Sequence, residues 1–123
     1  VFNIPRSIIL GSALSITRPL RIQGPAAPHN LTLTRTVNAF RLLEGTTSFL
    51  EVQNLIFTNG NGTNGGVINN GTGRTAVFVN CQFLNNINTG NGGAIANNGT
   101  LLLQGCYFSG NNGQATGGAI RSN

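Results

Sequence analysis

The chain has 123 residues with a formal net charge of +5, and only 7% of its residues are charged. This length suits one domain with a narrow hydrophobic core. The positive charge comes from scattered arginines, with neither a basic run nor interleaved aromatic residues, so the composition argues against a nucleic-acid partner. No apolar run approaches the roughly 18 residues that a bilayer-spanning helix needs, so we expect no membrane insertion.

Residues 1–48 are expected to form irregular coils that lead into the domain. Apolar residues alternate there with polar ones at the period of two that is typical of strands. The alternation predicts two inward-facing sets, which are Leu14, Ile16, Leu20 and Ile22, and then Leu31, Leu33, Phe40 and Leu42. The turn-rich segment 24–28 separates them. No capped apolar stripe with a period of about 3.6 residues occurs, so no long helix is predicted.

Residues 49–123 repeat one pattern three times, with a period of about 25–27 residues. Each copy contains a phenylalanine and, about nine residues later, a Gly-Gly pair followed by two aliphatic residues. The phenylalanines are Phe57, Phe83 and Phe108, and the Gly-Gly pairs begin at Gly65, Gly92 and Gly117. A fixed period of this size is the signature of a solenoid, in which each repeat buries its apolar face against its neighbours.

Alignment of the repeats on their phenylalanines predicts columns of inward side chains. The matching sets are Leu50, Val52, Leu55 and Phe57; Ala76, Phe78, Cys81 and Phe83; and Leu101, Leu103, Cys106 and Phe108. In each set the alternation shifts by one residue, which predicts a bend at Asn54, Asn80 and Gly105 because Asn and Gly tolerate left-handed backbone angles. We therefore predict an all-β fold, a parallel β-helix of about four to five coils that occupies residues 1–123 as one domain, without a clear C-terminal cap.

Two short motifs resemble the repeats of a known family. Residues 83–86 (Phe-Leu-Asn-Asn) and 108–111 (Phe-Ser-Gly-Asn) match a Phe-x-x-Asn motif, and residues 92–95 and 117–120 (Gly-Gly-Ala-Ile) match its companion. Together they are similar to the repeats of chlamydial-type polymorphic outer-membrane proteins and of autotransporter passengers. The resemblance implies a right-handed parallel β-helix at a bacterial cell surface. Residues 57–60 (Phe-Thr-Asn-Gly) place the Asn one position early, so we expect the first loop to have a different shape.

The inventory of reactive side chains argues against an enzyme. Glycoside hydrolysis needs a facing pair of carboxylates and calcium needs a cluster of acidic residues, but the chain has only Glu44 and Glu51 and no Asp. His29 lies in a Pro-rich loop without an identifiable nucleophile or orienting acid. Two thiols without a His partner do not predict a metal site. We therefore expect no catalytic, metal or cofactor site.

Cys81 and Cys106 occupy equivalent inward positions one coil apart. Parallel neighbours at strand spacing lie within the Cα separation that a disulfide can span. Alternatively, the two side chains form a buried stack of small apolar groups that point in parallel. Both interpretations fit the sequence.

Asparagines cluster at the predicted turns, where stacked amides form ladders between coils. The ladder candidates are Asn85, Asn86, Asn97, Asn98, Asn111 and Asn112. Four asparagines also satisfy the N-glycosylation sequon, namely Asn30, Asn61, Asn70 and Asn98. They are candidate glycan sites if the source cell has the transferase. Asn-Gly-Thr is also a good turn before a strand, so the sequons have a structural alternative.

Both ends of the repeat array are predicted to be uncovered. The last copy has no following strand to cover Phe108 and Ile120. At the other end, no amphipathic cap precedes the apolar residues Ile8, Leu10, Leu14 and Ile16. Two unlike apolar ends on one subunit predict a heterologous, head-to-tail contact.

We therefore expect a non-enzymatic, extracellular or cell-surface β-helix with a structural or adhesive role, whose partner is a second copy of the chain in a homo-oligomer or filament. The chain starts without Met and shows no intact signal peptide, which is typical of a processed chain or an excised segment. One alternative is a fragment of a longer adhesin or autotransporter passenger. The other is a carbohydrate-binding, pectate-lyase-like module with glycans as partners.

Overall fold

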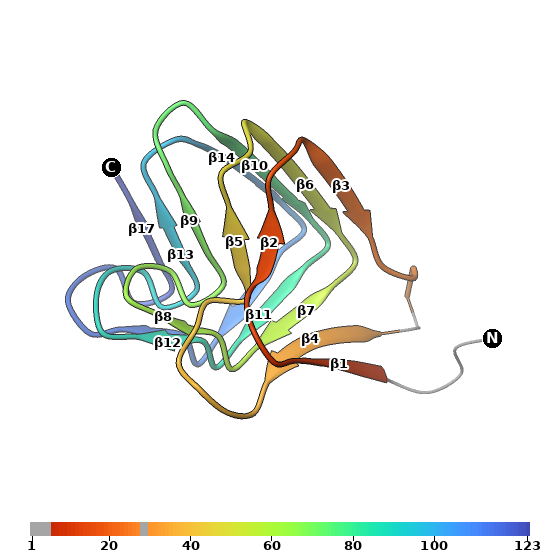
Figure 1. Cartoon of the computed structure of the whole chain (residues 1–123), viewed down its shortest axis with the longest axis horizontal. Coiled ribbons are helices and arrows are strands. Elements are labelled where there is room, and N and C mark those ends of the chain that lie inside the picture. The colour runs from red at the N-terminus through yellow and green to blue at the C-terminus, as the bar shows by residue number, and fades with distance from the viewer. Residues whose placement is uncertain (1–5, 28–29) are drawn as a thin grey trace.

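The alternating apolar segments form short strands that stack into a parallel β-solenoid of about five turns (Figure 1). The structure is a computed structural model and describes residues 6–27 and 30–123, which contain no helix. All pairings between the described strands are parallel. The predicted all-β fold of stacked parallel coils is therefore confirmed.

Each turn contributes one short strand to each of three or four sides. The first two turns contain β1 (Arg6–Leu10), β2 (Leu14–Ile16) and β3 (Leu20–Gln23), then β4 (Leu31–Arg35), β5 (Leu43–Gly45) and β6 (Phe49–Gln53). The third turn contains β7 (Ile56–Thr58), β8 (Asn61–Gly62), β9 (Ile68–Asn70) and β10 (Thr75–Val79). The fourth contains β11 (Gln82–Leu84), β12 (Ile87–Asn88), β13 (Ile95–Asn97) and β14 (Thr100–Gln104). The fifth contains β15 (Tyr107–Ser109), β16 (Asn112–Gly113) and β17 (Ile120–Ser122).

The strands stack into a five-stranded sheet, β1-β4-β7-β11-β15, and a four-stranded sheet, β3-β6-β10-β14. A third side consists of β2-β5 and β9-β13-β17, which are joined by backbone hydrogen bonds such as that from Leu43 N–H to Val67 O (2.8 Å). The two-residue strands β8-β12-β16 form the fourth side. Residues one turn apart pair in register, so equivalent side chains form columns along the solenoid axis.

Apolar columns fill the interior. Phe83 stacks on Phe57 with 5.3 Å between ring centroids and on Phe108 with 4.6 Å, and Phe78 meets Phe83 edge-on at 5.1 Å. All of the inward positions predicted for the first two repeats are buried. Phe108 is only half-buried, because no described turn covers the fifth one.

The predicted bend between the four-stranded and five-stranded sheets is confirmed. Asn54, Asn80 and Gly105 have positive φ angles of 56°, 51° and 60°. Asn and Gly adopt this left-handed conformation with the least strain. One residue is therefore enough to turn the chain from one sheet to the next.

A second left-handed corner, which sequence reasoning missed, follows the five-stranded sheet. Its residues are Asn59, Asn85 and Gly110, with φ angles of 61°, 55° and 65°. Asn59 is thus the counterpart of Asn85, and the corner residue itself has the same left-handed conformation in all three copies. The first loop differs after this corner. The segment between β8 and the pair at Gly65 is one residue shorter than the segment between β12 and the pair at Gly92.

Asn86 and Asn111 form the predicted ladder beside this corner. Asn86 Nδ2 donates to Phe57 O (3.0 Å), and Asn86 Oδ1 accepts from Gly60 N–H (2.9 Å). Asn111 Nδ2 donates to Phe83 O (2.7 Å), and Asn111 Oδ1 accepts from Asn86 N–H (3.1 Å). Each amide therefore satisfies backbone groups of the preceding turn at a point where the sheet ladder is interrupted.

The Gly-Gly pair is explained by close approach of the backbone. Gly92 has a φ of +64°, and a Cβ on Gly93 would lie 2.3 Å from Asn112 N and 2.6 Å from Gly118 O. No side chain fits at such distances. The pair therefore lets the loop after each two-residue strand fold back against the neighbouring turn.

We expect Phe83→Ala to lower the free energy of unfolding by about 3–5 kcal/mol, because it removes a fully buried ring that contacts three other rings. Chemical denaturation measures this change. Phe49→Ala is the matched control, since Phe49 is 37% exposed, and it should cost no more than about 1 kcal/mol. Equal costs for the two variants would contradict the inward assignment of Phe83.

Candidate functional site

The two cysteines lie in neighbouring turns and are both free thiols in the structure. Cys81 is buried, and its Sγ lies 3.4 Å from Val52 O in the preceding turn. Cys106 is half-buried, and its Sγ lies 3.3 Å from Phe78 O, which is the equivalent carbonyl oxygen one turn further along. The side chains thus point in parallel along the axis, as the stack interpretation expects. The disulfide itself stays a prediction.

Cys81 is a poor nucleophile in the folded chain. Burial, with a smaller contribution from the nearby Cys106, raises the pKa of the Cys81 thiol to about 11. The thiolate is the reactive species, so Cys81 remains protonated and unreactive at neutral pH. The position of this thiol is consistent with packing and not with catalysis.

In the folded protein at pH 8 we expect a thiol reagent to label Cys106 and to leave Cys81 unmodified, because only Cys106 is partly exposed. Labelling of Cys81 should accelerate as the pH rises toward about 11, where its thiolate forms. Mass spectrometry after digestion counts the labels. The unfolded, unreduced protein supplies the control, since two labels per chain exclude a disulfide and none establishes it.

The four sequon asparagines differ in exposure. Asn30 and Asn98 are exposed and Asn61 is half-buried, but Asn70 is only 3% exposed. Asn70 Nδ2 donates to Asn97 Oδ1 (2.7 Å) and to Thr100 O (2.9 Å). The nitrogen that would carry a glycan is therefore committed to a buried hydrogen-bond column, which disfavours Asn70 in the folded chain.

If the chain is glycosylated in its source cell, sugar increments should map to Asn30 and Asn98 and be absent from Asn70. Peptide mapping by mass spectrometry locates them. Occupancy of Asn70 at the level of Asn98 would mean that the transferase acts before the third and fourth turns stack. An unmodified mass of natively isolated protein would remove the glycan prediction.

The structure places the predicted end residues at the two axial ends, with one exception. Ile8 and Leu14 are 46% and 39% exposed, and Leu10, Phe108 and Ile120 are half-buried. Ile16 is wrongly assigned to an exposed end layer, because it pairs with Gly45 in β5 and is only 3% exposed. Two further end residues were missed. They are Leu20 on the edge strand β3 and Leu103 on the edge strand β14, which are 41% and 38% exposed.

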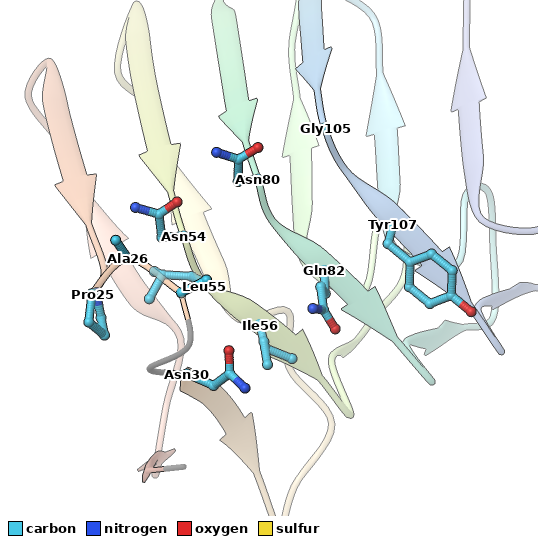
Figure 2. A pocket seen from close by; sticks show the side chains of 11 residues that line it. Pro25, Ala26, Asn30, Asn54, Leu55, Ile56, Asn80, Gln82, Gly105 and Tyr107 are labelled. Atoms are coloured by element: carbon cyan, nitrogen blue, oxygen red, sulfur yellow. The ribbon is translucent and has the colours of Figure 1, made fainter. Parts of the chain in front are cut away.

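A groove with a volume of about 360 Å³ lies on the outer surface of the corner between the four-stranded and five-stranded sheets (Figure 2). Pro25 and Ala26 line one end of it and Tyr107 lines the other. Between them lie side chains from two successive corners, among them Asn54 and Ile56 from one and Asn80 and Gln82 from the next. Sequence reasoning missed this groove, since it involves outward residues that carry no repeat motif.

The charged groups do not gather at the groove. Glu44 lies 2.8 Å from Arg41, and Glu51 lies 2.8 Å from Arg21. A hydrogen bond from Gln53, together with Arg21, lowers the pKa of the Glu51 carboxyl. Each carboxylate thus pairs with a different arginine. His29 lies outside the described residues.

Within residues 6–27 and 30–123 no three or more His, Cys, Asp or Glu side chains cluster as a metal ion would require. The same residues form no helix that is long and apolar enough to cross a membrane. Comparison of the chain with protein-family models, with curated proteins and with solved structures gives no match. The β-solenoid architecture is thus established by the structure itself, and the proposals on function rest on the surfaces of the solenoid.

Proposed function

We propose that the protein is a non-enzymatic structural or adhesive module of the cell surface or extracellular space, whose axial ends bind other solenoid turns. The observation that carries this proposal is a pair of apolar layers, one at each end of the solenoid, that no described segment covers. Ile8, Leu14 and Leu20 form the layer of the first turn, each exposed by 39% or more. At the other end the layer consists of Leu103 from the fourth turn with Phe108 and Ile120 from the fifth. Exposed apolar layers of this kind mark contact surfaces.

The backbone at these ends supports the same proposal. β1 and β3 are edge strands at one end, and β14, β15 and β17 are edge strands at the other. Edge strands offer unpaired N–H and C=O groups to another strand, and proteins normally protect them with charge, proline or a covering segment. Arg6, Arg21 and Arg121 place a positive charge on three of these edge strands, but no described segment covers either end.

The two ends are complementary in strand order and direction. Each presents the five-stranded sheet, the third side and the four-stranded sheet, and all strands in each sheet are parallel. A second copy could therefore place its β1 beside β15, its β2 beside β17 and its β3 beside β14. This contact is heterologous, so it propagates into a filament unless its rotation closes a ring. Stacking of copies is the function that we propose first.

The same layers also support a second candidate, a section of a longer adhesin or autotransporter passenger. The half-buried Phe108 and Ile120 of the fifth turn have the same residue types as their buried partners Phe83 and Ile95 in the fourth. Further turns of one chain would cover them as well as a second copy does. The motif resemblance and the exposed sequons Asn30 and Asn98 support a surface location in both cases.

Sedimentation velocity over a range of protein concentrations tests the stacking proposal. We expect the isolated chain to associate and Ile120→Lys to abolish association, because the lysine places a charge in the end layer. Leu102→Lys is the matched control, since Leu102 lies on the edge strand β14 at the same end of the solenoid, is 51% exposed and faces sideways. It should leave end-to-end association intact. A folded monomer at all concentrations would refute stacking and favour the longer-solenoid candidate.

A further inference from the structure

We propose that the corner groove binds a neutral, linear oligosaccharide that runs along the solenoid axis. The inference does not depend on end-to-end stacking, because the groove lies on the side of the solenoid (Figure 2). Its volume of about 360 Å³ falls in the range of small-molecule sites. Four observations, on its repeat, its amides, its aromatic ring and its backbone, indicate the class of ligand.

The first observation is the axial repeat of the lining residues. Ile56, Gln82 and Tyr107 pair in register on β7, β11 and β15, and therefore occupy the same position in three successive turns. Neighbouring parallel strands are about 4.8 Å apart, which is close to the length of one sugar ring in an extended chain. A polymer with that repeat can make an equivalent contact with each turn.

The second observation is a set of amides without protein partners. The side chains of Asn30, Asn80 and Gln82 line the groove and make no hydrogen bond with any described residue. A Cβ on Gly105 would lie only 2.4 Å from Asn80 Oδ1. The glycine therefore leaves room for the Asn80 amide at this corner. An amide both donates and accepts hydrogen bonds, and therefore suits the neighbouring hydroxyl groups of a sugar.

The third observation is an exposed aromatic ring beside the amides. Tyr107 is 59% exposed and lies at the end of the groove, next to Gln82 on the adjacent strand. A ring with an open apolar face and a hydroxyl tip can stack on the C–H face of a sugar while the amide binds its hydroxyl groups. None of the described lining residues is charged, so we expect a neutral sugar and not a uronate chain.

The fourth observation argues against an extended peptide. Peptides that add to a sheet need a free strand edge. Here the backbone N–H groups of Asn54, Asn80, Gln82 and Tyr107 already donate to carbonyls of neighbouring turns. The groove therefore offers side-chain amides and a ring, which recognise hydroxyl groups better than a peptide backbone.

The chain contains its own probe for this proposal, because Tyr107 is the only tyrosine and no tryptophan is present. Titration of the Ile120→Lys variant with cellohexaose, xylohexaose, mannohexaose and laminarihexaose should give a saturable change in tyrosine fluorescence with at least one of them. Isothermal titration calorimetry then gives the Kd. The charged comparison is hexagalacturonate, and a neutral Pro-rich hexapeptide is the peptide comparison.

We expect Tyr107→Ala to raise the Kd for the sugar by about tenfold or more, as measured by calorimetry. Tyr107→Phe should retain most of the affinity because it keeps the ring, and Gln82→Ala should lose part of it. Leu102→Ala, exposed in the same turn but outside the groove, is the control and should bind normally. Unchanged affinity in both Tyr107→Ala and Gln82→Ala would overturn the proposal. Binding of hexagalacturonate or of the peptide without binding of any neutral sugar would also overturn it. So would the failure of every neutral sugar to bind at millimolar concentration. Circular dichroism verifies that each variant is folded.

Discussion

The whole structure depends on one constraint: a single turn cannot bury its own inward-facing side chains and needs a neighbouring turn to cover them. Phe83 is fully buried only because Phe57 lies on one side and Phe108 on the other. The backbone obeys the same constraint, since each turn satisfies its hydrogen bonds on the turns before and after it. Stability is therefore close to a sum of nearest-neighbour terms, and it is lowest where a neighbour is missing.

The corners show how this constraint acts on individual residues. Where the chain leaves a sheet, its backbone loses the regular ladder, and side chains must replace it. Asn is suited to this task because it tolerates a positive φ and also carries an amide, as Asn85 and Asn86 do at consecutive positions. Gly fits where a neighbouring amide or carbonyl takes the space of a Cβ, as at Gly105. The high Asn and Gly content is thus a consequence of stacking turns with few residues per corner.

The sequence predicts those parts of the fold that repeat. The period of about 25–27 residues fixes the columns through Phe57, Phe83 and Phe108, because equivalent residues must stack. The alternation places Ile16 inward correctly, but the sequence did not show that this residue of the end turn is almost fully buried, since its burial depends on the irregular second turn that pairs β5 with β2. The groove was not predicted either. An alternating pattern marks Gln82 and Tyr107 as outward residues, but it does not show that residues 25–27 line the same groove.

The end contact and the groove are connected by geometry. In one chain the segment that begins at Gly24 closes the groove at the third turn, because Gly24 N–H donates to Gln53 O beside the corner. If a second copy placed its β3 beside β14, its own Gly24 segment would lie beside Gly105 and Tyr107. The groove would then be bounded at both ends and would span three turns per copy. Stacking would therefore set the length of sugar chain that fits, whereas in a longer solenoid the groove would continue for as many turns as keep a one-residue corner.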